Sequence, residues 1–114
     1  MNLDLLKICQ EYAEKYSITL ILKGAPTFIF HPDKGIFSNP TGNPGMATAG
    51  AGDVLTGLIA SLLAQGLSPH QAACLGVYIH GIAGEQAALE FTSYCMVASD
   101  LFDFFPTSFA FVTR

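Results

Sequence analysis

The sequence has few charged residues, and its cations are concentrated in the first third of the chain. Charged side chains make up 12% of the 114 residues, about half of their share in a typical globular domain. Between Gly35 and Thr113 there is no Lys or Arg, and the formal net charge is -4. Because nucleic acids and anionic lipids both attract clustered cations, neither is an expected partner. The apolar share of 51% also argues against a disordered chain.

Long apolar runs and clustered cysteines are also missing. The best candidate for a membrane span, residues 54–64, has only 11 residues and is interrupted by Thr, Gly and Ser, whereas a spanning helix needs roughly 20. The N-terminus shows no charged-then-apolar signal pattern, so we expect a cytoplasmic protein. Cys9, Cys74 and Cys95 are too widely spaced for a disulfide scaffold or a zinc site. We expect each of them to be a small buried apolar residue.

The apolar content is high for a chain that is expected to form one domain at most. Mean hydropathy is +0.44. Such a chain either forms a very compact fold or uses part of its apolar surface to meet a partner.

The hydrophobic periodicity predicts an α/β chain. An apolar run at residues 17–23 is typical of a strand buried on both faces, as in parallel sheets. Two short strands follow, joined by a turn containing Pro, Asp and Gly. The expected elements are helices at 3–16, 53–65, 69–90 and 99–105, a strand at 17–23, and a hairpin of strands 27–30 and 35–38.

Local signals predict where several of these helices begin and end. Gly66 is expected to end the helix at 53–65, and Pro106 is expected to end the last helix. Ser68 and Gln71 form a capping box before the long helix. One face of that helix consists of small residues, which allow close packing: Ala72, Ala73, Gly76, Ala83, Gly84 and Ala87.

The most informative segment is residues 43–57, with the sequence NPGMATAGAGDVLTG. Gly45, Gly50 and Gly52 precede a helix that is expected to start at Asp53. Backbone N–H groups of such a loop and the positive end of the helix dipole together form a site for phosphate. We expect a positive φ at Gly52. Because the chain has so few cations, backbone dipoles would have to hold the anion.

Asp53 stands at the start of this helix, where a carboxylate commonly acts as a cap or a partner of the dipole. Beside a phosphate, however, it would repel the ligand. It fits such a site if it accepts the proton of a hydroxyl that attacks the phosphate. Asp53 is therefore also a candidate general base.

The same segment resembles a known family. AGAGDVLTG is similar to the anion-hole and catalytic-aspartate motif of the ribokinase-like superfamily. The longer TGNPGMATAGAGDVLTG resembles one branch of it, the ADP- or ATP-dependent NAD(P)H-hydrate dehydratases. KGAPT at 23–27 resembles the nucleotide segment KGAGT of that family, and GVYIHG at 76–81 and MVASD at 96–100 resemble two further segments. The resemblance extends over about residues 3–105.

The resemblance implies that residues 1–114 are the C-terminal part of a ribokinase-like three-layer α/β/α domain, with the N-terminal half of the domain absent. Such a part would contain a buried strand, a short β-hairpin and three to four helices. The expected partners are a second copy of the chain or the missing N-terminal half.

The resemblance also implies a role for each matching residue. Asp53 would be the catalytic base and would also contact the substrate. Asn43 would be a further substrate contact. ADP or ATP would bring Mg²⁺, and no residue of the chain is expected to ligate a metal. Two positions depart from the family pattern: Ala51 replaces a usual Ser, and Pro26 replaces a usual Gly. The expected nucleotide-binding residues are Lys23, Gly24, Ala25, Pro26, Thr27, Gly50, Ala51 and Gly52.

The activity implied is that of a lyase that dehydrates hydrated NADH and NADPH at the expense of ADP or ATP. Two alternatives are a non-catalytic nucleotide-binding remnant and one half of a split enzyme. A third is another small-molecule kinase of the superfamily, against which the TGNPGMAT segment argues. His80 lies on a mostly apolar helix, and we interpret it as a buried core histidine.

Overall fold

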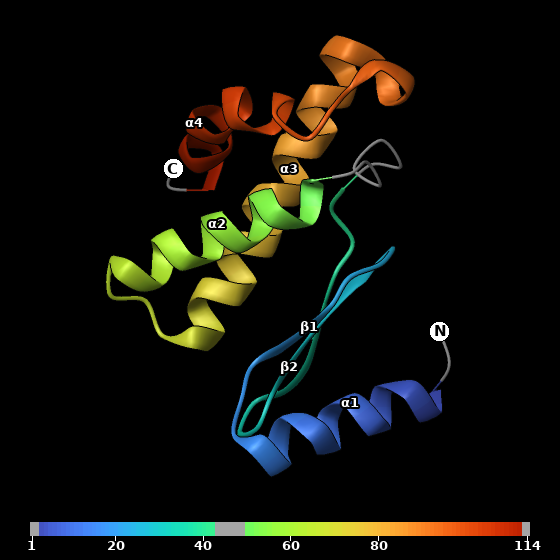
Figure 1. Ribbon diagram of the computed structural model, residues 1–114, viewed down its shortest axis with the longest axis vertical. Helices are drawn as coiled ribbons and strands as arrows, with labels where there is room; N and C mark the ends of the chain where they lie inside the picture. Colours follow the sequence, from blue (N-terminus) through green and yellow to red (C-terminus); the bar gives the residue numbers. More distant parts are fainter. Residues whose placement is uncertain (1–2, 43–49, 113–114) are drawn as a thin grey trace.

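A computed structural model describes residues 3–42 and 50–112, with side chains to residue 110. A three-stranded sheet separates one helix from two others, which gives three layers (Figure 1). Ile29 faces the second and third helices, whereas its neighbour Phe30 faces the first, because successive side chains of a strand point to opposite faces. The chain therefore has the α/β/α layering that the sequence predicts.

The first helix, α1 (Leu3–Tyr16), matches its predicted bounds. Cys9 and Ala13 are buried against Phe30 of the sheet. Much of the predicted apolar face nevertheless lies open to solvent. The exposed apolar side chains on this helix are Leu3, Leu5, Ile8, Tyr12 and Tyr16.

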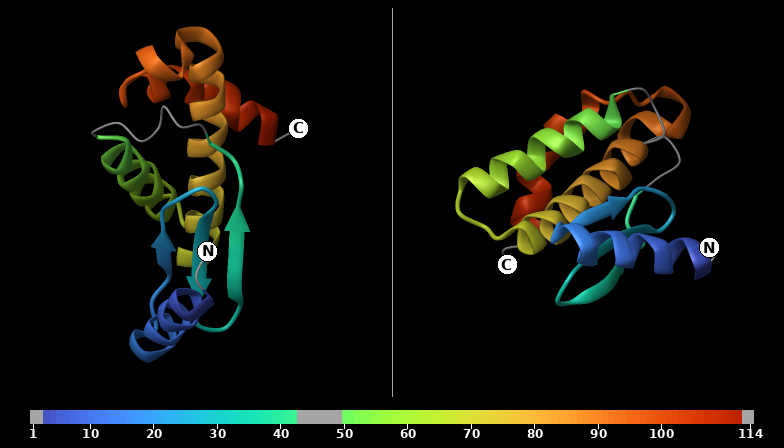
Figure 2. Two further views of the ribbon diagram at one scale, coloured as in Figure 1. Left: turned by 90° about the vertical axis from the view of Figure 1, so that its right-hand side faces the viewer. Right: turned by 60° about the horizontal axis from the view of Figure 1, so that its bottom comes forward.

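The sheet consists of β1 (Leu20–Leu22), β2 (Thr27–His31) and β3 (Gly35–Asn39) in that spatial order (Figure 2). Both pairings are antiparallel, with Ile29 opposite Ile21 on one side and opposite Phe37 on the other. The predicted hairpin is thus confirmed.

The expected strand at 17–23 is shorter and less buried than predicted. Only three of its residues form β1, and all three are half-buried. Ser17 adopts a positive φ of 53°, and the N–H of Ile18 donates to the carbonyl of Ala13. The start of the apolar run therefore caps the end of α1 and does not join the strand. In the described part of the chain β1 pairs only with β2.

The second helix, α2 (Ala51–Ala64), and the third, α3 (Pro69–Cys95), pack against each other and against the sheet. Their connection follows the predicted signals, because Gly66 has a φ of 101° and Ser68 and Gln71 form the capping box. All six small residues of the predicted face are buried. A Cβ on Gly76 would lie 2.6 Å from Cγ1 of Ile59, so glycine allows α2 and α3 to approach closely.

Three helix boundaries differ from the predictions. Helix α2 begins two residues before Asp53, and α3 extends to Cys95 across a break at Thr92, whose φ is 65°. Helix α4 (Asp100–Val112) contains Pro106 instead of ending there. Proline deprives the carbonyl four residues earlier of its donor, but Phe102 and Pro106 are both exposed, so water can satisfy that carbonyl.

The cysteines are free, and their burial differs. Cys9 is buried as expected and Cys74 is half-buried, but Cys95 is exposed at the end of α3, contrary to the prediction. No helix within the described ranges is long and apolar enough to cross a membrane.

Candidate functional site

The predicted phosphate loop, residues 50–53, forms the N-terminal end of α2. Gly50 is the N-cap, with a left-handed φ of 93° and no capping side chain, and its carbonyl accepts the N–H of Val54 at 3.1 Å. The first N–H groups of a helix have no acceptor within it. The end of α2 therefore has the donor geometry and dipole that suit an anion.

The left-handed residue of this loop is Gly50, not Gly52 as the sequence suggested. A Cβ on Gly50 would lie 3.3 Å from the Cβ of Ala98, so the loop packs tightly against the segment after α3. Gly52 is exposed, and a Cβ there would meet nothing within 4 Å. The loop is thus clamped at Gly50 and open at Gly52.

Asp53 lies in the first turn of α2 and is exposed. Its carboxylate forms no hydrogen bond or ion pair with another residue of the described ranges. A carboxylate in this position interacts favourably with the helix dipole. It is also open to accept a proton from a bound hydroxyl.

The predicted nucleotide segment, residues 23–27, follows β1 directly and leads into β2. The hydroxyl of Thr27 donates to the carbonyl of Gly24 at 3.0 Å, which closes a tight turn through the cis peptide bond between Ala25 and Pro26. Lys23 is exposed, yet partial burial lowers the pKa of its ammonium group. The turn thus presents a cation at the end of β1.

His80 on α3 contacts the phosphate loop and lies near enough to Lys23 to feel its charge. Its side chain is 2% exposed, and its Nε2 lies 3.0 Å from the carbonyl oxygen of Ala51. Burial lowers the pKa of His80 to about 4, and the charge of nearby Lys23 lowers it further, whereas the hydrogen bond to Ala51 opposes the shift. His80 is thus hydrogen-bonded to the phosphate loop and electrostatically coupled to Lys23 of the predicted nucleotide segment.

Helix α3 also contacts residues 41–42, which directly precede residues 43–49. The carboxylate of Glu85 accepts the N–H of Gly42 at 3.1 Å. A Cβ on Gly81 would collide with the side chain of Thr41, so glycine is required for this close approach. The predicted substrate contact Asn43 lies outside the described residues.

Sequence reasoning missed the contributions of Ala98, Glu85 and, in part, His80. The burial of His80 was expected, but its bond to Ala51 was not. The GVYIHG segment, matched on both sides of the histidine, was the available signal. Ala98 and Glu85 act through contacts that span more than forty residues. The MVASD segment was the available signal for Ala98, whereas the contact of Glu85 leaves no local pattern.

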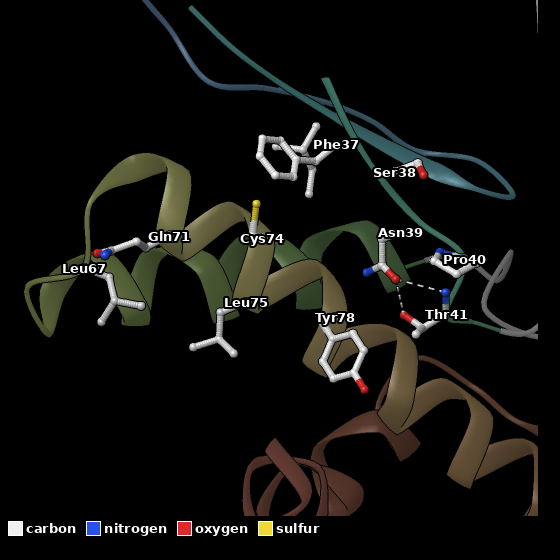
Figure 3. Close-up of a pocket in the computed structure, with 11 residues that line it drawn as sticks. Phe37, Ser38, Asn39, Pro40, Thr41, Leu67, Gln71, Cys74, Leu75 and Tyr78 are labelled. Atoms are coloured by element: carbon white, nitrogen blue, oxygen red, sulfur yellow. Dashed lines mark hydrogen bonds between the residues drawn. The ribbon is translucent and has the colours of Figure 1, made fainter. Parts of the chain in front are cut away.

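A separate groove of about 800 Å³ lies between β3 and α3 (Figure 3). Its walls are mostly apolar, and Asn39 at one end accepts the N–H and hydroxyl of Thr41. None of the predicted nucleotide residues lines this groove. Its lining comprises Ile29, Phe37, Ser38, Asn39, Pro40, Thr41, Leu67, Gln71, Cys74, Leu75 and Tyr78.

The layered fold and the glycine loop at a helix start define an α/β chain of the ribokinase-like class. The family model for NAD(P)H-hydrate dehydratase matches residues 1–107. The chain belongs to this family.

Relatives of known name agree with this assignment. A bifunctional NAD(P)H-hydrate repair enzyme of Moorella thermoacetica is 55% identical over 103 residues, which are 90% of this chain and 19% of that protein. The ADP-dependent (S)-NAD(P)H-hydrate dehydratase of Bacillus subtilis is 36% identical over 97 residues, covering 85% of this chain and 35% of that one.

The fold also matches a solved structure. The ADP/ATP-dependent NAD(P)H-hydrate dehydratase from Bacillus subtilis, co-crystallized with ATP/Mg²⁺, superposes with a TM-score of 0.85 and 33% identity, covering 93% of this chain and 38% of that chain. This chain therefore spans only about a fifth to two fifths of the length of these three proteins.

Proposed function

We propose that this chain takes part in the dehydration of hydrated NADH and NADPH with ADP or ATP as co-substrate. The observation that supports this most directly is the hydrogen bond from buried His80 to the phosphate loop, at a histidine that also feels the charge of Lys23. The loop carries the exposed carboxylate of Asp53. A simple turn would not need an open helix start with an exposed carboxylate in its first turn.

In the proposed reaction, Asp53 accepts the proton of the hydroxyl on the hydrated nicotinamide ring. The hydroxyl oxygen forms a bond to the terminal phosphorus of ADP or ATP as the bond to the departing AMP or ADP breaks. The ring C–O bond then breaks and releases phosphate, while the neighbouring ring carbon loses a proton to solvent water. The ring double bond is restored, and water has in effect been transferred to the nucleotide.

The roles of the other residues follow from where they lie. Gly50, Ala51 and Gly52 offer backbone N–H groups and the dipole of α2 to the transferred phosphoryl group. Lys23 supplies a positive charge near the same loop, and the turn through Thr27 shapes the nucleotide segment. We propose Asn43 as a further substrate contact.

Mg²⁺ would neutralise the charge of the nucleotide phosphates. The described ranges 3–42 and 50–112 contain no cluster of three or more His, Cys, Asp or Glu that could hold a metal. Mg²⁺ commonly keeps its waters and binds phosphate oxygens with only one or two carboxylates. The residues present therefore fit an ion that arrives on the nucleotide, and we propose this arrangement.

We further propose that the catalytic unit includes the remaining part of the family domain. The exposed apolar residues of α1 support this, as does the half-buried β1, which pairs only with β2 among the described residues. We place the reaction in the cytoplasm, where ADP and nicotinamide nucleotides are used. The alternative, a nucleotide-binding remnant without turnover, is supported by the small share of the relatives that the chain covers.

Asp53→Asn in the full-length polypeptide that carries these residues tests the proposal. Loss of a general base typically lowers turnover about 100- to 10,000-fold, and we expect a loss in this range while ADP affinity, measured by calorimetry, is preserved. Asp33→Asn, the same change in an exposed hairpin turn, is the matched control. Near-normal turnover of the Asp53 variant would contradict the proposed base.

A further inference from the structure

His80 is a buried histidine to which the proposed reaction assigns no step. It lies on α3, and its Nε2 is 3.0 Å from the carbonyl of Ala51, 29 residues earlier in the chain. A carbonyl oxygen can only accept, so Nε2 carries the proton and donates. The bond therefore ties the phosphate loop to the longest helix of the fold.

The acceptor of this bond has a particular position in the loop. The carbonyl of Ala51 and the N–H of Gly52 belong to one planar trans peptide group, so they point in opposite directions. When the Ala51 carbonyl is held toward His80, the N–H of Gly52 points away from the histidine. Ala51 is 2% exposed, whereas Gly52 is exposed, so the peptide group has a clamped side and an open side.

The surroundings of His80 suit a neutral donor. Its burial and the nearby ammonium of Lys23 both oppose protonation, so the imidazole remains uncharged near neutral pH. Lys23 is then the positive charge of this region, and it remains exposed. The histidine can therefore anchor the loop without placing a buried cation beneath it.

Close packing of α3 makes this reach possible. Gly81, next to His80, leaves space for Thr41, and Gly76, one turn earlier, leaves space for Ile59 of α2. Both glycines bring the backbone of α3 near its neighbours. A histidine at position 80 can therefore bridge to the first turn of α2.

We propose that His80 is a positioning residue, whose Nε2–H bond to the Ala51 carbonyl aims the Gly52 N–H at the transferred phosphoryl group. This role rests on the proposed function of the loop. The bond fixes the orientation of the Gly52 N–H through the backbone. In this proposal His80 itself touches neither nucleotide nor substrate. Its loss should affect phosphate binding and turnover more than it affects folding.

Two substitutions in the full-length polypeptide separate positioning from packing. His80→Gln keeps an N–H donor of similar reach, whereas His80→Leu keeps a similar volume without a donor. ADP affinity by calorimetry, kcat and KM for hydrated NADH, and the thermal unfolding midpoint are measured for each. His70→Leu, a histidine of the same helix that contacts Phe37 and His31, is the control.

We expect His80→Leu to weaken ADP binding and lower kcat by about tenfold or more. The reason is that loss of the hydrogen bond to Ala51 also misdirects the Gly52 N–H that donates to the phosphoryl group. KM for hydrated NADH should change less than kcat. His80→Gln should remain within about threefold of the wild type, and His70→Leu should bind ADP normally. Equal losses in the Gln and Leu variants, or normal ADP affinity in His80→Leu, would overturn the positioning role.

Two further outcomes are decided by the wild-type protein. If His80→Leu does not fold, nitrogen-15 NMR of the wild-type histidines decides: the Nε2–H tautomer, with a proton protected from exchange, supports the proposal, and the Nδ1–H tautomer overturns it. If the wild-type protein neither binds ADP nor dehydrates hydrated NADH, the proposed function fails and the role of His80 fails with it. Normal wild-type activity with an unaffected His80→Leu variant removes only the positioning role.

Discussion

At the start of α2, one glycine determines the backbone conformation of the loop and another leaves the loop accessible. Gly50 carries the left-handed backbone and contacts Ala98, whereas Gly52 faces open space. A side chain at each position therefore disturbs a different property of the loop. His80 beneath them is the one buried group of the described site whose charge state changes with pH in an accessible range.

Gly52→Val should weaken ADP binding and leave the free energy of unfolding nearly unchanged. The φ of Gly52 is not in the left-handed region, and a Cβ added there would meet nothing within 4 Å. The valine side chain therefore fills only the volume proposed for phosphate. Gly50→Ala should instead destabilise the chain by about 1–2 kcal/mol, because an L-residue is strained at positive φ. Calorimetry and urea unfolding separate the two effects. Unchanged ADP affinity in Gly52→Val would mean that the loop is only a turn.

The low pKa of His80 predicts a loss of stability in acid. A histidine with a folded pKa of about 4 and an ordinary pKa of about 6.5 when unfolded binds its proton more readily in the unfolded chain. Its contribution is thus fully present above about pH 6.5 and is lost as pH falls toward about 4, by about 3 kcal/mol in total. Urea unfolding of the wild type and His80→Gln across this window checks it. Identical pH profiles would contradict the shift.

At the scale of elements, glycines decide how closely the helices pack. Gly76 lies on α3 where Ile59 of α2 crosses it, while Gly57 lies on the exposed side of α2 with nothing within 4 Å. Both are interior helix positions, where alanine is intrinsically favoured over glycine by about 1 kcal/mol. Packing alone distinguishes them.

Gly76→Ala should lower the free energy of unfolding by about 1–2 kcal/mol, because the overlap with Ile59 outweighs the gain in helix propensity. Gly57→Ala should raise it by about 0.5–1 kcal/mol. Chemical denaturation of both variants provides the measurement. A stabilised Gly76→Ala variant would show that α2 and α3 can separate without cost.

At the scale of the whole molecule, an apolar surface remains uncovered. The outer face of α1 exposes Leu5, Ile8, Tyr12 and Tyr16, and β1 pairs along only one edge in the described chain. Sheet edges and apolar patches of this kind promote association. The molecule is therefore expected to need a further partner for its stable form.

Alone, the 114-residue chain should self-associate and show little or no dehydratase activity. Replacing Ile8 and Tyr12 with Glu should shift it toward the monomer in analytical ultracentrifugation, whereas Leu89→Glu, on the exposed end of α3, should not. Adding the N-terminal half of the family domain should restore a monodisperse species and turnover of hydrated NADH. A folded 12.1 kDa monomer that turns over substrate unaided would contradict this prediction.

The sequence by itself determined the helices, the hairpin and the glycine loop, because periodicity, caps and turn residues act over a few neighbouring positions. The capping box of Ser68 and Gln71 and the helix end at Gly66 are local signals of this kind. The family segments were likewise recognisable from their residues alone.

Only the tertiary structure decided features that depend on distant contacts. Pro106 lies within α4 for two reasons. The solvent-facing side of the helix leaves the carbonyl without an N–H partner open to water, and the other side of the helix packs on α3. The strand within the apolar run at 17–23 is short because the first residues of the run cap α1, and it is antiparallel because its partner is the neighbouring strand β2. His80 connects to Ala51 because glycines bring α3 close to its neighbours. Such contacts depend on where the packed elements meet, and no spacing within a single segment encodes that.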